Sequence, residues 1–490
     1  MSAKREHGQV QPGIKWGPFT MRVPFVHLRL SLPDMLQGVA VAGATGLALV
    51  PYFTNILGLS FEEAVTMAMF HSILISVSWF AFGDPYAPGW LTPAIPFVIQ
   101  FITLPAYNSD HTLQFQAMTA LTLDFTFILI VLGLTGLGAK LVQWVPNVLK
   151  GGIILGAAVA AFLRVTTPND AANVFSGTAT IPAAPIAGSC AIIICLIFAF
   201  SKPMQALAAG NKWIAKLLSF GLLPGFLIAG VVGLITGEFD YNIRSGILDV
   251  PAAVSSLWAK ASPFYIGWPS LEMFADAFVL ALITYILFFG DVVTGNEMIE
   301  HAKEARPDEK LDINPTRAHI ATGIRNAIMA VIAPFFTTQG VLWTGIQVIL
   351  LKRWAQGREK VDSFFDIVGS FYVFGIPVLF VVLPIVTLLQ PLLPVALAIT
   401  LILTAFACAT LSLSLVKDAT ERGAMVITAM AFGVFEEPYV GLLVGFGVIV
   451  VLCGWKVFIP SHEIDDFGPV HEHARQKPVE LDKKVIAEEG

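Results

Sequence analysis

Charged residues are scarce in this sequence: Asp, Glu, Lys and Arg make up 13% of the 490 residues, whereas hydrophobic residues make up 56%. A water-soluble globule cannot cover that much apolar surface, so the composition excludes a soluble protein. The formal net charge is −6 and Lys and Arg form no basic block, so we expect no nucleic-acid partner. The chain is therefore predicted to be an integral membrane protein surrounded by membrane lipids.

Cysteine is also scarce, and all four cysteines lie inside apolar runs without the spacing of metal ligands. We expect no metal site and no cofactor, and interpret the thiols as small buried hydrophobic groups. Residues 1–31 lack the apolar core and the cleavage site of a signal peptide, so we expect them to form a cytoplasmic tail.

Long apolar runs, by contrast, recur from residue 34 to residue 459, and runs of about 20 residues are typical of membrane-spanning helices. The sequence predicts an all-α polytopic membrane protein with fourteen transmembrane elements. Their expected bounds are Asp34–Leu57, Phe61–Phe82, Pro93–Leu104, Ala117–Leu137, Val145–Leu163, Ile181–Phe200, Ile214–Thr236, Phe274–Asn296, Ala318–Phe336, Val341–Leu351, Phe364–Leu383, Leu393–Leu415, Gly423–Phe435 and Val440–Phe458.

The third element of each half is too short to span a membrane, and an odd count of seven elements inverts the second half. Short segments at corresponding positions of two inverted repeats indicate a transporter's binding site. We therefore predict two inverted repeats of seven, with short half-helices 3 and 10 preceded by extended segments. The expected parts are a cytoplasmic tail (1–33), the first repeat (34–236), an extracytoplasmic loop (237–273), the second repeat (274–458) and a cytoplasmic C-terminal tail (459–490).

The distribution of Lys and Arg favours an orientation with both termini in the cytoplasm. In that orientation only Arg164, Arg244 and Lys260 fall on the outer side, and the other 26 of the 29 basic residues lie at inner ends, inner loops or tails. Because positive residues are retained on the cytoplasmic side, we expect a multi-pass protein of the inner (plasma) membrane.

Polar residues directly precede both half-helices. Polar backbone at membrane depth is tolerated only where it is buried in protein or lines a cavity, and the first N–H groups of a helix attract anions. The residues that we expect to bind a solute there are Thr92, Pro93 and Ala94 in the first half and Thr337, Thr338, Gln339, Gly340, Trp343 and Thr344 in the second. The alternative for each segment is a proline-kinked or hydrated turn packed against neighbouring helices.

Asp291 lies in the eighth apolar run, where a carboxylate costs about 2.5–3.5 kcal/mol on insertion scales at the helix centre and is by default functional. On a helix, Thr294 shares its face, and Leu287 lies on it one turn earlier. We predict that Asp291 and Thr294 couple transport to H⁺ or Na⁺. The alternatives are a structural hydrogen bond to another helix and a position close enough to the interface to be solvated. Gln37 is predicted to bind the solute, with a bond to a neighbouring helix as an equal alternative.

Four short segments together resemble the nucleobase–ascorbate transporters of the uracil/xanthine permease type. The same seven-plus-seven fold is shared, more distantly, with sulfate permeases and bicarbonate exchangers. The segments are Gly43–Pro51 (GATGLALVP), Gly89–Ile99 (GWLTPAIPFVI), Val292–Asn296 (VVTGN) and Ala321–Asn326 (ATGIRN). Their order and spacing carry the resemblance, which covers most of the spanning region.

The resemblance implies a core domain of helices 1–4 and 8–11 that carries the substrate, a gate domain of helices 5–7 and 12–14, and a homodimer. Nucleobase members usually place glutamates at the positions of Leu287 and Thr344, and often a histidine at that of Gln37. Leu287 is therefore included among the expected substrate-binding residues, and its apolar side chain puts uracil or xanthine in doubt. A divergent member is implied.

We therefore expect a secondary active transporter, and not an enzyme, that moves a small polar or anionic solute by alternating access, coupled to H⁺ or Na⁺. The alternative is a nucleobase permease that stacks the base on Trp343 and hydrogen-bonds it through Gln339 or Asp291. A channel would need a continuous polar lining, and a membrane-embedded enzyme would need a nucleophile–base pair or a metal cluster in the spanning segments.

Overall fold

The computed structural model describes residues 5–459 apart from 109, 139, 141–143, 180, 212, 215–222, 374–376 and 436, and it is mostly helical. Residues 460–490 of the expected C-terminal tail lie outside the described residues. Before the half-way point the elements are β1 (Ile14–Trp16), β2 (Phe19–Met21), α1 (Leu32–Gly46), α2 (Val50–Asn55), α3 (Phe61–Val77), the π-helical turn η1 (Ser78–Phe82), the 3-10 turn η2 (Thr92–Ala94), α4 (Ile95–Ile102), α5 (His111–Thr135), α7 (Asn147–Thr166), α8 (Pro185–Phe200), α9 (Lys202–Gly210) and α11 (Leu223–Thr236).

The second part of the chain repeats the alternation of long and short helices. Its elements are α12 (Val250–Ala261), α13 (Pro263–Ile266), α14 (Leu271–Lys303), α15 (Pro315–Ile332), α16 (Thr344–Trp354), α17 (Phe364–Val373), α18 (Pro377–Val381), α19 (Leu383–Leu389), the 3-10 turn η3 (Gln390–Leu392), α20 (Leu393–Ser414), α21 (Ala419–Val434), α22 (Pro438–Cys453) and the 3-10 turn η4 (Trp455–Phe458). Thr344 begins α16, and the short helix Thr92–Ile102 stands at the corresponding place in the first half. Two short half-helices are therefore present close to where the sequence predicts them.

Local sequence signals explain why the long helices begin and end where they do. The side chain of Ser60 accepts a hydrogen bond from the Glu63 backbone, and the Glu63 side chain accepts one from the Ser60 N–H, which is a capping box at the start of α3. Asp110 caps α5, which stops at Gly136 with a left-handed φ of 68°. Within the described residues five helices are long and apolar enough to cross a membrane, or six if a pair bent by 60° counts as one. The count of fourteen elements stays a prediction.

Several expected boundaries are wrong because turns interrupt apolar runs. The first expected helix is two helices, since α1 ends at Gly46 and α2 begins at Val50 with Pro51 in its first turn. In the eleventh run α18 ends at Val381 and α19 begins at Leu383, whereas residues 374–376, between α17 and α18, lie outside the described residues. The expected loop 237–273 contains α12 and α13. Apolar composition alone does not distinguish a continuous helix from a broken one.

The N-terminal segment expected to be a tail packs on the helices from residue 5 onward. The β1–β2 hairpin lies on η1, where the Trp16 indole donates to the Ala81 carbonyl (2.8 Å) and the Arg22 N–H to the Phe80 carbonyl (2.8 Å). Arg22 is 1% exposed, and its guanidinium lies 3.7 Å from the ring centroid of Phe365. Contacts with residues that are far away in the sequence therefore hold this segment in place.

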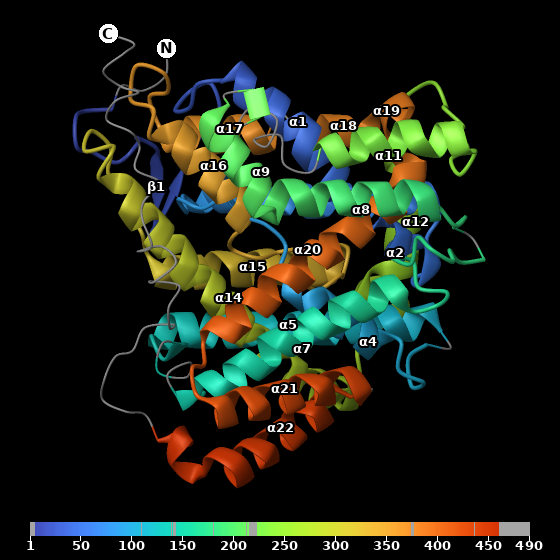
Figure 1. Cartoon of the computed structure of the whole chain (residues 1–490). Coiled ribbons are helices and arrows are strands. Elements are labelled where there is room, and N and C mark those ends of the chain that lie inside the picture. The colour runs from blue at the N-terminus through green and yellow to red at the C-terminus, as the bar shows by residue number, and fades with distance from the viewer. Residues whose placement is uncertain are drawn as a thin grey trace.

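The helices pack in two groups. In the α5/α14 group, α5 packs against α14 and α15, α1 against α17, and α3 and α16 join them. In the α7/α20 group, α7 packs against α20 and α21, α22 against α21, and α8 against α11 and α20. The N-terminal strands lie at one end of the bundle and α12 at the other, which we call the β1 end and the α12 end (Figure 1).

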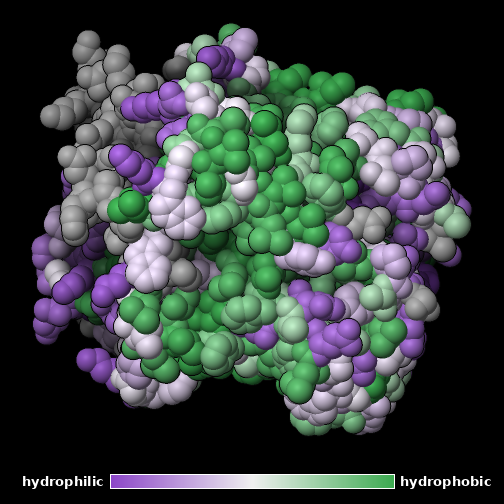
Figure 2. Space-filling model, turned by 90° about the horizontal axis from the view of Figure 1, so that it is seen from below, coloured by the Kyte–Doolittle hydropathy of each residue, from purple (hydrophilic) through white to green (hydrophobic). Residues whose placement is uncertain are grey.

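The outer surface of the helices is apolar. In the view from below, hydrophobic side chains cover the middle of the visible face and hydrophilic ones gather toward its edges (Figure 2). Phe127, Leu134, Leu234, Leu443 and Val451 are all more than 60% exposed. Contiguous exposed apolar surface on this scale is typical of a protein embedded in a membrane.

Candidate functional site

The two extended segments that precede the half-helices cross each other in an antiparallel arrangement. The Leu91 N–H donates to the Thr337 carbonyl (2.7 Å), the Gly340 N–H to the Gly89 carbonyl (2.8 Å) and the Trp343 N–H to the Ala87 carbonyl (2.7 Å). These bonds satisfy backbone groups that would otherwise be costly at membrane depth. The crossing thus holds both half-helix N-termini in one place.

Glycine is required at the crossing because the two backbones are nearly in contact. A Cβ on Gly340 would lie 2.7 Å from the Gly89 carbonyl oxygen, and a Cβ on Gly89 would lie 2.6 Å from the Cβ of Trp343. Both distances are too short for real Cβ contacts. The expected role of Gly340 in contacting a solute is therefore replaced by a role in allowing close approach.

Buried polar side chains of α15 form hydrogen bonds to the second extended segment. Arg325 of α15 is fully buried, and its Nη2 donates to the Gly340 carbonyl (3.1 Å) and to the Thr322 hydroxyl (3.0 Å). Asn326 donates from Nδ2 to the Gln339 carbonyl (3.1 Å). Both residues belong to the ATGIRN segment, whose arginine inside an apolar run was the signal for this role.

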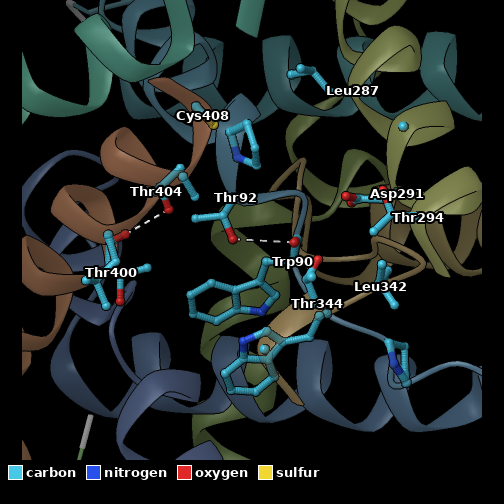
Figure 3. Close-up of a pocket in the computed structure, with 18 of the residues that line it drawn as sticks. Trp90, Thr92, Leu287, Asp291, Thr294, Leu342, Thr344, Thr400, Thr404 and Cys408 are labelled. Carbon is cyan, nitrogen blue, oxygen red and sulfur yellow. Dashed lines mark hydrogen bonds between the residues drawn. The ribbon is translucent and has the colours of Figure 1, made fainter. Parts of the chain in front are cut away.

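A cavity of about 610 Å³ lies at the crossing, between the two helix groups. The α5/α14 group contributes the ends of both half-helices and one face of α14, and the α7/α20 group contributes α20 with single residues of α7 and α8. The side chains of Thr92, Asp291, Thr344 and Thr404 surround it (Figure 3). A cavity of this volume accommodates a small organic molecule.

Seven of the thirteen expected site residues line this cavity. They are Thr92, Pro93, Leu287, Asp291, Thr294, Trp343 and Thr344. Leu287, Asp291 and Thr294 do so from one face of α14, as their spacing predicts. The structure brings the half-helix ends and the α14 carboxylate together in one place.

Asp291 is half-buried and is the only charged residue among the described residues that line the cavity. Within the described part of the chain it has no hydrogen-bond or ion-pair partner. Figure 3 shows its carboxylate beside Thr294, with the Thr92 and Trp90 segment opposite. An unpaired carboxylate in a membrane-embedded cavity is available to a proton or a ligand.

The remaining expected residues lie elsewhere. Gln339 faces away from the cavity, since its Nε2 donates to the His71 carbonyl (3.0 Å) and its Oε1 accepts from Arg325 (3.3 Å). The Thr338 hydroxyl donates to the Phe335 carbonyl (3.1 Å). Thr337 is buried with a φ of 87°, unusual for a β-branched residue. Gln37 and Ala94 are likewise not among the lining residues.

Sequence reasoning missed the contribution of α20. Thr400, Thr404 and Cys408 line the cavity at intervals of four residues, so they share one helix face. The Thr400 hydroxyl donates to the Ala396 carbonyl (2.8 Å) and the Thr404 hydroxyl to the Thr400 carbonyl (2.8 Å). The signal was a row of small polar residues in an apolar helix.

A second overlooked carboxylate, Asp124, lies in the middle of α5. It is half-buried, and its Oδ2 is buried without a hydrogen-bond partner among the described residues. Asp124 does not line the cavity. The sequence shows this aspartate within the fourth expected apolar run. Because Asp124 lies outside the cavity, an Asp124 variant is a matched control for an Asp291 variant.

Ionisable groups also cluster outside the helices, near the N-terminal strands. Hydrogen bonds from Arg306, together with those from Arg5, hold the pKa of Asp308 well below its usual range. Burial raises the pKa of Glu309, which nevertheless accepts hydrogen bonds from Ser363 and from the Phe364 N–H. This cluster ties residue 5 to the α14–α15 and α16–α17 connections.

A scan against protein-family models gives no match, and a search of curated proteins gives none either. Among solved structures, the chain is similar to the transmembrane domain of a cyanobacterium bicarbonate transporter, BicA, with 13% identity over 86% of this chain and 99% of that chain (TM-score 0.47). It is also similar to SLC26A9, with 16% identity over 86% of this chain and 65% of that one (TM-score 0.45).

A third likeness is to the murine Slc26a9 anion transporter in the inward-facing state, with 15% identity over 86% of this chain and 68% of that chain (TM-score 0.42). At these identities and TM-scores the likenesses carry no argument about what this chain does. They do not show membership of the nucleobase–ascorbate family, so that resemblance stays a prediction.

Proposed function

We propose that the protein is a secondary active transporter that moves a small polar solute across a membrane by alternating access. One observation carries this proposal: the unpaired Asp291 lines a cavity formed where two half-helices meet, between two separately packed helix groups. Binding sites at half-helix ends near the midplane are a recurring arrangement in transporters. An enzyme or a structural protein has no need of it.

The moving parts in this proposal are the two helix groups. The α5/α14 group corresponds to the expected core domain, and the α7/α20 group to the expected gate domain. Among the described residues, hydrogen bonds join α2 to the segment that follows α7, between Tyr52 and Asp170 (3.1 Å) and between Thr178 and Asn55 (3.3 Å). Another joins α4 to the α21–α22 connection, from Gln100 to the Phe435 carbonyl (2.6 Å). Tyr52 and Asn55 belong to α2, which lies toward the α12 end (Figure 1). Exposing the cavity on that side requires breaking these bonds.

A proton fits the coupling role of Asp291 better than Na⁺ does. Na⁺ sites in transporters use unwound backbone carbonyls in addition to side-chain oxygens. α14 is continuous from Leu271 to Lys303, so its carbonyls near Asp291 are occupied by helical hydrogen bonds, and only Thr294 adds an oxygen on the same face. A proton needs the carboxylate alone.

The residues that line the cavity constrain the class of solute more than the fold does. No Lys, Arg or His occurs among the described residues that surround the cavity, so an anion would meet only uncharged hydrogen-bond donors there. A nucleobase remains the second candidate because the indoles of Trp90 and Trp343 both line the cavity and would stack on a planar ring.

The test is transport by purified protein in proteoliposomes, using a solute selected by thermal stabilisation from a panel of nucleobases, amines, carboxylates, bicarbonate and sulfate. Asp291→Asn is expected to retain downhill flux at saturating solute and to lose accumulation driven by a pH gradient, because the amide cannot carry a proton. Asp124→Asn, which also removes a carboxylate from the membrane, is expected to retain both. Full accumulation by the Asp291→Asn variant would overturn the coupling role.

Two further proposals concern the assembly. We propose a homodimer with both termini on the cytoplasmic side of the inner (plasma) membrane, on the basis of the resemblance and of the Lys and Arg distribution. The mass of the detergent-solubilised protein, measured by light scattering, tests the dimer. Protease access to the N-terminal segment in sealed vesicles of known orientation tests the topology.

Single-channel currents would indicate a channel instead of a transporter.

A further inference from the structure

Among the described residues that line the cavity, the only charge is negative. Asp291 is its only charged side chain, and the other titratable groups of the described lining are the thiol of Cys408 on α20 and the phenol of Tyr372 on α17. The Tyr372 hydroxyl donates to the Pro88 carbonyl (2.6 Å). η2, α4, α7, α8 and α16 contribute no ionisable side chain to the described lining. In an apolar cavity an ionised carboxylate attracts a cation strongly because the low dielectric does not screen it.

Aromatic rings form part of the wall. Trp90 comes from the first extended segment and Trp343 from the residue before α16, while Phe200 of α8 and Tyr372 complete the set. The face of an aromatic ring carries a negative potential, and indole attracts ammonium groups most strongly. Apolar side chains of α14 and α20 make up much of the remaining surface.

The hydroxyl groups around the cavity add hydrogen-bond acceptors. The Thr400 hydroxyl donates its proton to a backbone carbonyl. The Thr404 hydroxyl donates to the Thr400 carbonyl and the Thr92 hydroxyl to the Trp90 carbonyl (3.4 Å), as the dashed lines in Figure 3 mark. The lone pairs of these oxygens therefore remain for a solute that donates hydrogen bonds. A protonated amine has such donors and no acceptor. A quaternary ammonium ion has neither, so the carboxylate and the aromatic rings alone would hold it.

The N-termini of the two half-helices oppose a cation. Neither end, at Thr92 or at Thr344, has a side-chain cap, and a helix N-terminus carries a partial positive charge of about half an elementary charge. The first end is the weaker donor because Pro93 and Pro96 have no N–H. The effect of a helix end falls off within one turn, whereas a cation paired with an ionised Asp291 meets a full negative charge at contact distance.

We propose that the transported solute is an organic cation, an ammonium ion with apolar or aromatic substituents, which pairs with Asp291 and packs against Trp90 and Trp343. This inference rests on the proposed transport function and narrows its solute. Because one carboxylate holds either a proton or the cation, the two compete for Asp291. Transport is then an exchange of protons for cations, in which each conformational change carries one or the other.

Binding of three small probes to the full-length protein tests the charge preference. Benzyltrimethylammonium is a cation, phenylacetate an anion and benzyl alcohol neutral, and all three carry one phenyl ring. We expect only benzyltrimethylammonium to raise the thermal unfolding midpoint at neutral pH. Its affinity is expected to fall about tenfold per pH unit once the pH is low enough to protonate Asp291, because the proton competes.

Variants locate the site. Asp291→Asn is expected to weaken benzyltrimethylammonium binding by on the order of tenfold or more and to remove its pH dependence. Asp124→Asn is expected to leave both unchanged. Trp343→Leu is expected to weaken binding, Trp343→Phe to preserve most of it because the aromatic face remains, and Trp258→Leu, on the exposed surface of α12, to have no effect.

The outcomes separate this inference from the proposed function. Stabilisation by phenylacetate without stabilisation by benzyltrimethylammonium would overturn the cation but leave a transporter. Equal binding of benzyltrimethylammonium to wild type and Asp291→Asn would also overturn it. An outward proton gradient that drives uptake of labelled benzyltrimethylammonium into proteoliposomes would support both, whereas specific binding without any flux would retain the cation site and reject transport.

Discussion

The contact between Gly89 and Gly340 offers the sharpest test of the crossing, because a single methyl group cannot be accommodated there. In Gly340→Ala the added Cβ would lie 2.7 Å from the Gly89 carbonyl oxygen and 3.0 Å from the Leu91 backbone nitrogen. Both are backbone atoms fixed by hydrogen bonds, so relief requires the two segments to separate.

The cost follows from two terms. Overpacking a well-filled site costs about 1–3 kcal/mol. Separating the segments also weakens the 2.8 Å bond from the Gly340 N–H to the Gly89 carbonyl, a net loss of about 1 kcal/mol. We therefore expect Gly340→Ala to lower the free energy of unfolding by about 2–4 kcal/mol in total. It should also weaken solute binding, because both half-helix ends shift.

The assay is the thermal unfolding midpoint of purified protein, combined with binding of the best stabilising solute. Gly423→Ala is the matched control: a Cβ there has nothing within 4 Å and the residue lies within α21. Alanine in a helix is more favourable than glycine by up to about 1 kcal/mol, so this variant should be neutral or slightly stabilised. Equal midpoints for Gly340→Ala and wild type would refute a tight crossing.

Three further predictions concern polar groups outside the cavity. Tyr52→Phe removes a hydrogen bond to the buried Asp170, so we expect a lower unfolding midpoint and faster hydrogen exchange in the segment after α7; unchanged exchange would mean that this contact does not hold the groups together. Arg325→Met leaves the Gly340 carbonyl without its side-chain donor, at a cost of about 1–3 kcal/mol for an unsatisfied buried group, and an unchanged midpoint would contradict it. Asp308→Asn removes a carboxylate whose pKa is lowered in the folded protein, so its stabilisation is present above about pH 4 and is lost as the pH falls through the folded pKa; the midpoint difference from wild type should therefore shrink in acid.

Several features of the cavity could be predicted from the sequence because their interpretation does not depend on tertiary contacts. Two short apolar runs preceded by polar residues indicated half-helices, and α4 and α16 are the result. A carboxylate within an apolar run indicated a functional group, and Asp291 lines the cavity together with Thr294 and Leu287. Their roles in coupling and recognition stay predictions.

Other residues could not be assigned correctly from the sequence because their direction depends on the partner segment. Gln339 and Thr338 are next to the crossing, yet their side chains bond to α3, α15 and local backbone instead of lining the cavity. Thr400 and Thr404 belong to a row of small polar residues that the sequence shows, but packing alone brings that row opposite Asp291. A residue's proximity in sequence to a motif does not determine which way it points.

The sequence by itself determined that this chain is a membrane protein of apolar helices, with two short elements at corresponding positions and a carboxylate within one long helix. Those properties follow from the length of apolar runs and the cost of burying charge, which are local quantities. Only the tertiary structure decided that two glycines let the extended segments cross, that Arg325 holds them from behind, and that Asp291 shares a cavity with two indoles and no basic residue among the described lining. Those facts depend on contacts between residues about 15 to 250 positions apart, which no local pattern specifies.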